Sequence, residues 1–152
     1  MLVEAYSLSS LTYRMKKMEI EQKDGIESWG NLNVKLKHPD HDEKFERLTG
    51  YGYLSMGEES FRIKLAKTID GHLYYMAAVG SWNLEINKEY PLKGNRDLIF
   101  AHLEFDEIPG DQYADGTFRL TRGKPYPQGV FDFVEEGAFS ASGDFEFLEV
   151  RE

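Results

Sequence analysis

The chain contains no cysteine, which excludes disulfide bonds and thiolate metal sites. This composition fits a reducing compartment, so we expect a cytoplasmic protein. Apolar runs of about 18 residues, the length that crosses a membrane, are also missing, and we expect no membrane contact. The N-terminus lacks a basic start followed by an apolar core, and we therefore expect no secretory signal.

Positive charge is scarce. The chain has 18 Lys and Arg against 27 Asp and Glu, a formal net charge of −9, and residues 77–152 carry 7 basic against 15 acidic side chains. Such an excess of carboxylates repels phosphate backbones, which argues against nucleic-acid binding. It attracts basic proteins. The alternative is that the acids only keep an aromatic-rich sheet in solution.

Aromatic residues are abundant, with ten Phe, nine Tyr and two Trp in 152 residues. In the last third of the chain they alternate with polar residues, since Phe131 and Phe133 bracket Asp132 and Phe145 and Phe147 bracket an acid. This is the period of a strand with one wet and one dry face. The length fits one domain, 1–152.

The same alternation predicts eight or nine strands, and Asp70-Gly71 predicts a hairpin turn. The expected strands cover residues 31–37, 45–55, 61–68, 72–79, the set Trp82, Leu84 and Ile86, then 98–105, 117–121, 129–134 and 139–150. The apolar parity slips after Phe147, which predicts a bulge or the end of the strand. We expect a mostly β fold, either an antiparallel sandwich or an up-and-down, lipocalin-like barrel.

Residues 10–23 are ambiguous. Leu11, Met15 and Met18 recur at helical spacing, and Gly25 follows as a helix stop would, so we expect a helix near 10–23. A strand through residues 13–21 is the alternative, because Met18 and Ile20 also alternate with charges.

Two histidines and an acid form a candidate metal site. His38, His41 and Asp42 lie in one polar loop, and imidazole and carboxylate are ligands for zinc or manganese. The alternative is a solvated loop, because no distant third ligand is evident. We therefore expect no cofactor.

Acids also gather between residues 106 and 116. Clustered carboxylates can bind calcium, but the spacing is not that of an EF-hand, and Asp115-Gly116 reads as a turn. A basic partner is the other use for such a cluster. The acids expected at a partner interface are Asp106, Glu107, Asp111, Asp115, Glu135 and Glu136.

Tyrosine and tryptophan side chains could line a ligand cavity inside a barrel. The candidates are Trp29, Tyr74, Tyr75, Trp82, Tyr113 and Tyr126. Tyr74 and Tyr75 are adjacent, so one should face inward and the other outward. Packing in the core is the alternative for all of them, and above all for Trp82.

Signatures of covalent catalysis are missing. The sequence has no Gly-x-Ser-x-Gly elbow, Gly-rich phosphate loop or dinucleotide fingerprint. His72 and His102 could each act as a base, but the sequence names no partner for either. A carboxylate pair for glycoside hydrolysis remains open, because acids are common in the chain.

The tail Ser142-Gly143-Asp144-Phe145-Glu146-Phe147 resembles the closing strands of small bacterial lipocalin-like and β-sandwich domains. The resemblance covers about a tenth of the chain and implies a β-sandwich or barrel.

Our leading hypothesis is a non-enzymatic protein-binding module, such as an inhibitor or immunity-type protein that neutralises a basic partner. A homodimer through an edge strand is also open. The first alternative is a lipocalin-like carrier for a small apolar molecule. The second is a metal- or carboxylate-dependent enzyme that acts on carbohydrate.

Overall fold

The computed structural model describes residues 26–110 and 113–150, and in them every regular element is a strand. The helix expected near 10–23 lies outside the described residues. None of the described residues forms a helix long and apolar enough to cross a bilayer.

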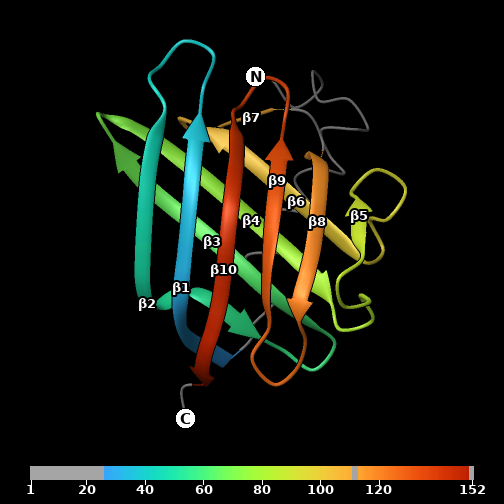
Figure 1. Cartoon of the computed structure of the whole chain (residues 1–152). Coiled ribbons are helices and arrows are strands. Elements are labelled where there is room, and N and C mark those ends of the chain that lie inside the picture. Colours follow the sequence, from blue (N-terminus) through green and yellow to red (C-terminus); the bar gives the residue numbers. More distant parts are fainter. Residues whose placement is uncertain (1–25, 111–112, 151–152) are drawn as a thin grey trace, which may run out of the picture.

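Ten antiparallel strands form one sheet, in the order β5-β8-β9-β10-β1-β2-β3-β4-β6-β7. Their bounds are β1 Ile26–Lys37, β2 Lys44–Met56, β3 Ser60–Ile69, β4 His72–Ser81, β5 Glu89–Pro91, β6 Ile99–Phe105, β7 Ile108–Pro109, β8 Asp115–Arg122, β9 Gln128–Val134 and β10 Ser140–Val150. The sheet curls into a half-barrel, with β2, β1, β10, β9 and β8 in front of β3, β4 and β6 (Figure 1). The predicted mostly β, barrel-like fold is confirmed.

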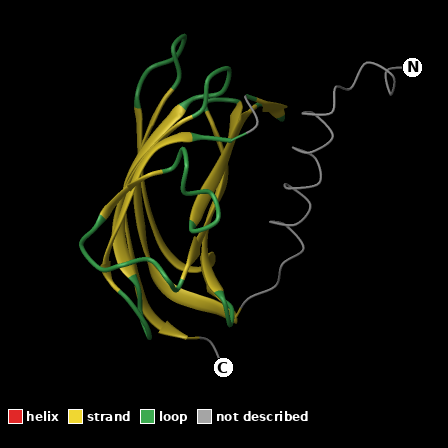
Figure 2. Cartoon of the chain, turned by 90° about the vertical axis from the view of Figure 1, so that its right-hand side faces the viewer, coloured by secondary structure: helices red, strands yellow, loops and turns green. Residues whose placement is uncertain are grey.

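Period-two alternation accounts for the inner face. Leu32, Val34 and Leu36 of β1 are buried, and Phe145 and Phe147 of β10 lie on the same side. Figure 2 shows the strands curving around this shared interior. The ring of Phe61 sits at its centre, 5.1–6.2 Å from four other aromatic rings. Those rings belong to Trp82, Phe118, Phe145 and Phe147.

The slip in parity after Phe147 is a β-bulge. Glu149 pairs with Trp29, and Phe147 pairs with Gly30, so Leu148 is the extra residue. The bulge turns Leu148 outward, where it is exposed.

A seam, rather than strand pairing, joins the β6 side of the sheet to the β8–β9 side. Ala114 donates its amide to the carbonyl of Ala101 at 2.9 Å. Glu135, in the loop after β9, accepts the amide of Leu103 at 3.0 Å. The two ends of the curled sheet are therefore linked by an amide and a carboxylate from connecting segments.

One predicted strand is wrong. Trp82, Leu84 and Ile86 lie in successive turns between β4 and β5, not in a strand. The amide of Leu84 bonds the carbonyl of Ser81, which closes a turn, and Asn87 has a left-handed backbone with φ 64°. Local turn hydrogen bonds therefore override the alternation of three apolar side chains.

Candidate functional site

Three turns converge at one end of the half-barrel, at the upper left of Figure 1. They are the β1–β2 loop (residues 38–43), the β3–β4 turn (70–71) and the β6–β7 turn (106–107). His41 of the first lies with its ring centroid 4.3 Å from that of His72, which follows the second. His38 packs on Phe105, before the third, at 4.1 Å. We call this region the acidic histidine end.

Its members come from all three turns and from the strands beside them. They are His38, Asp40, His41, Asp42, Glu43, Lys44, Asp70, His72, Phe105, Asp106 and Glu107. Six carboxylates therefore face one lysine and three histidines. With the imidazoles neutral, this end carries more than half of the net charge of the chain.

Two-residue turns place the acids there. Asp70 and Gly71 have φ of 52° and 81°, and Asp106 and Glu107 have φ of 52° and 64°. Two left-handed residues in succession match the twist of a hairpin, and Asp and Gly tolerate that backbone best. The Asp70-Gly71 hairpin is thus confirmed, and a second one joins β6 to β7.

Asp106 anchors His72. Its Oδ2 lies 2.7 Å from Nδ1 of His72, and its Oδ1 accepts the backbone amide of Leu73 at 2.8 Å. The hydrogen bond with His72 and then that with the amide hold the pKa of Asp106 below its ordinary value. The carboxylate therefore stays ionised and fixes the orientation of the imidazole.

Lys44 and Asp70 form the second anchor, with Nζ 2.6 Å from Oδ2. This hydrogen bond raises the pKa of Lys44 and lowers that of Asp70. Asp70 is exposed and Lys44 is partly exposed, so the pair ties the β3–β4 turn to the start of β2 without adding much stability.

The three imidazoles stack around Phe105. His41 is 4.9 Å from His38, and Phe105 lies 5.1 Å from His72, between ring centroids. Nδ1 of His38 accepts the amide of Asp40 at 3.1 Å, so this nitrogen is engaged within its own loop. Ring stacking and the local hydrogen bond hold the β1–β2 loop against the barrel end.

A pocket of about 280 Å³ opens beside these rings. Its lining consists of Asp40, His41, Asp42, Lys44, Ile69, Asp70, His72 and Tyr74. Carboxylates and imidazoles dominate the lining, so the pocket suits a cationic group better than an apolar one.

The pairing of an acid with His72 has the geometry that orients a general base. In the described part of the chain, however, no hydroxyl group of serine or threonine is hydrogen-bonded to this histidine. The pair therefore lacks the nucleophile that would complete a triad.

The predicted metal ligands are brought together only in part. His38 and His41 are neighbours, and Asp42 lines the same pocket as His41. Across residues 26–110 and 113–150, no three His, Asp or Glu side chains are grouped as the ligands of a metal ion. The metal site stays a prediction.

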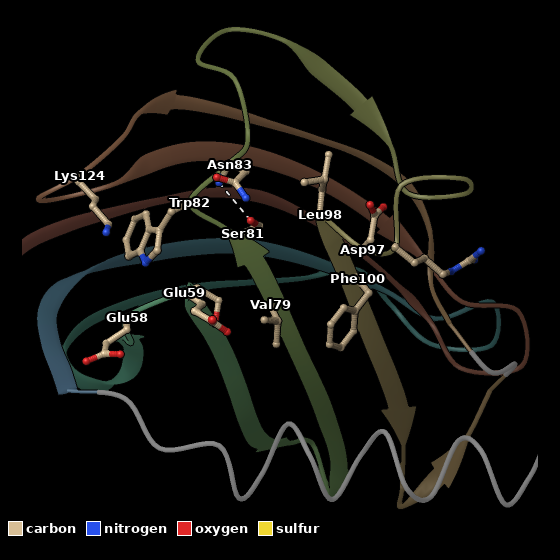
Figure 3. Close-up of a pocket in the computed structure, with 12 residues that line it drawn as sticks. Glu58, Glu59, Val79, Ser81, Trp82, Asn83, Asp97, Leu98, Phe100 and Lys124 are labelled. Atoms are coloured by element: carbon tan, nitrogen blue, oxygen red, sulfur yellow. Dashed lines mark hydrogen bonds between the residues drawn. The ribbon is translucent and has the colours of Figure 1, made fainter.

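A larger groove, of about 690 Å³, lies at the far ends of β4 and β6 (Figure 3). Val79 and Phe100 form its apolar wall, and Trp82 with Lys124 stands at one side. The ammonium of Lys124 is 4.9 Å from the centre of the Trp82 ring. Glu58, Glu59 and Asp97 add carboxylates to the rim.

The predicted aromatic ligand site is dispersed. Tyr74 faces the interior and Tyr75 the opposite face of β4, as their adjacency predicts. Trp82 lines the groove, and Tyr126 packs against the core. Tyr113 stacks on His102 at 5.2 Å. Trp29 is partly exposed and contacts Tyr51.

The predicted partner-binding acids do not form one surface. Asp106 and Glu107 belong to the acidic histidine end, while Asp115 pairs with Arg96 at 3.1 Å. Glu136 is exposed beside the seam, and Asp111 lies outside the described residues.

The prediction that Glu135 lies on a partner-binding surface is corrected, because this residue is only 2% exposed. Its carboxylate is held in the seam by the amide of Leu103, so it is not available to a partner.

Sequence reasoning missed the bond between His72 and Asp106. A partial signal was present in the sequence, because His72 directly follows the Asp70-Gly71 turn. The pairing of β4 with β6 then places this turn beside the Asp106-Glu107 turn. Leu73 accepts from the amide of Asp106 at 2.8 Å, which sets this register. Finding it required knowing that β4 pairs with β6.

Compared with known proteins, the chain matches no protein family, no curated protein and no solved structure.

Proposed function

We propose that this protein is a non-enzymatic binding module that recognises a basic protein partner through the acidic histidine end. The observation that carries the proposal is the convergence of six carboxylates, from three separate turns, on one end of a rigid sheet. Loops held on such a scaffold are the usual place for recognition. A local excess of one charge also speeds the encounter with a partner of opposite charge.

The anchoring of the turns supports the same proposal. Asp106 is bonded to His72 and to an amide, Asp70 is bonded to Lys44, and His38 stacks on Phe105. These contacts fix the turns before any partner arrives. A surface that is already ordered loses less conformational entropy on binding, which favours affinity.

The packed interior gives less support to a carrier. Aromatic rings lie within about 6 Å of Phe61 on several sides, and a Cβ added at Gly80 would stand 2.4 Å from the same ring. An apolar ligand inside the barrel would have to displace these side chains.

The test is affinity capture from the native host with three forms of the full chain. The first is wild type, and the second carries Asp40→Asn, Asp42→Asn and Glu43→Gln. The third, a matched control, neutralises Glu85, Glu89 and Asp97 instead. We expect the same basic protein to be retained by wild type and control and lost from the second form.

Binding of the recovered partner should then be measured by calorimetry. Affinity should fall as salt rises, because salt screens exposed charges. Equal capture by all three forms, or affinity indifferent to salt, would refute the proposal.

A further inference from the structure

The outer face of the front strands carries two stripes of opposite charge. Asp132 of β9 and Asp144 of β10 form the acidic stripe. Lys35 and Lys37 of β1 and Arg47 of β2 form the basic stripe. All five point outward. Lys35 and Asp132 each lie between two residues that are buried in the core, and Lys37, Arg47 and Asp144 are themselves exposed.

The strand register fixes where the stripes lie. One row across the sheet runs from Asp132 through Ser142 and Lys35 to Phe45. The next row runs from Val130 through Asp144 and Asn33 to Arg47. Neighbouring strands are about 4.8 Å apart, so Asp132 lies roughly 10 Å from Lys35 along the sheet.

Within the described part of the chain, these charges form no ion pairs. Among the described residues, ion pairs involve neither Lys35, Lys37 nor Arg47, and neither Asp132 nor Asp144. Asp144 accepts one hydrogen bond, from the side-chain amide of Asn33 at 2.9 Å. The stripes are therefore available to charges from another molecule.

Exposed apolar side chains accompany the stripes. Phe45, beside Lys35 in the basic stripe, is 69% exposed. Val130 and Val134 flank Asp132 on β9 and are also exposed. A partner that covered these side chains would remove their apolar surface from water.

We propose that this face binds a second copy of the chain. A two-fold axis parallel to the strands, between β10 and β1, exchanges β9 with β2 and β10 with β1. Each acidic stripe then lies over a basic stripe, and Phe45 of one copy falls over Asp132 of the other, with Val130 and Val134 on either side. Such a surface is complementary to itself, which is what a two-fold dimer requires.

The contact is small. The four strands from β9 to β2 and three rows of side chains span about 15 Å in each direction, by the ordinary spacing of sheets. This is well below the roughly 800 Å² per partner of a standard interface. We therefore expect a weak, transient dimer.

The end strands of the sheet are less suited to binding a second copy than this face is. The two end strands are short, since β5 has three residues and β7 has two, so these two strands present few free backbone groups to another chain. The face, rather than the edge strand expected from the sequence, is the surface of self-association.

The experiment is sedimentation equilibrium of the full chain from about 0.01 to 1 mM, at low and high salt. Wild type should associate to dimers at the upper concentrations, and less so at high salt. Lys35→Glu with Arg47→Glu should be monomeric, as should Asp132→Lys with Asp144→Lys. Glu85→Lys, a charge reversal on a remote turn, should behave as wild type.

Mixing the two monomeric variants is the decisive experiment. In a mixed pair, both stripe contacts are again between opposite charges, so an equimolar mixture should recover association of at least wild-type strength. Circular dichroism checks that each variant is folded. A monomeric wild type at all concentrations, or a mixture that stays monomeric, would overturn the proposal.

Discussion

The two walls of the half-barrel differ in how many faces they bury. On β10, Phe145 and Phe147 are buried, whereas the residues between and around them are at least partly exposed. On β4, both faces are buried, with Tyr74 and Met76 on the core side and Ala77 on the other. The comparison teaches that strict alternation marks a strand with one wet face, and an unbroken apolar run marks one with none.

The largest effect should come from the dry face of the front wall. Phe145→Ala removes a fully buried ring that packs on Phe61 and Phe118. We expect a loss of about 3–5 kcal/mol in the free energy of unfolding, measured by urea titration. Glu146→Ala, on the wet face next to it, should cost under about 0.5 kcal/mol. Equal losses would mean that the faces are assigned wrongly.

The next comparison sets the outer faces of the two walls against each other. Ala77 of β4 is fully buried, and Ser142 of β10 is only partly so. Ala77→Gln adds volume and a polar amide to a closed site and should cost about 2–4 kcal/mol. Ser142→Gln should cost under about 0.5 kcal/mol. Similar thermal shifts for the two variants would show that the outer face of β4 is open to water.

The seam between the walls should respond to a smaller degree. Glu135→Ala leaves the buried amide of Leu103 without this acceptor, which should cost about 1–3 kcal/mol. Glu135→Gln retains an acceptor oxygen and should cost less. Glu136→Ala, at an exposed position, is the control and should be near neutral in urea titrations. A neutral Glu135→Ala would show that the seam adds no stability.

The smallest effect is electrostatic. The pKa of Asp106 is lowered in the folded protein by His72 and an amide. Its stabilising effect is therefore present above the pKa of the unfolded carboxyl and is lost as the pH falls through the folded value. Asp106→Asn should lower the melting temperature at pH 7, and the difference from wild type should shrink as the pH falls below about 3.9, the ordinary value for Asp. A constant difference across this range would exclude the ionic contribution.

Periodicity predicted most of the sheet, because burial of one face constrains every second residue of a strand. It failed at Trp82, Leu84 and Ile86, where three apolar residues at strand spacing lie in turns. Apolar residues have the same spacing in this segment as in the true strands. Only the backbone hydrogen bonds of Ser81 and Asn87 distinguish the turns from a strand.

The site was less predictable than the fold. His38, His41 and Asp42 adjoin each other in sequence and were found as a group. Asp70, His72 and Asp106 join them only through the pairing of β3, β4 and β6. Contacts between residues more than 30 positions apart depend on topology, which single-sequence patterns do not give.

The seam has a consequence for how the molecule fluctuates. Its hydrogen bonds to the backbone of β6 come from the amide of Ala114 and the carboxylate of Glu135, and separating it leaves each strand ladder intact. Partial opening along this line should therefore require less free energy than global unfolding. In deuterated solvent, the amides of Ala114 and Leu103 should exchange earlier than those in the middle of β1 or β10.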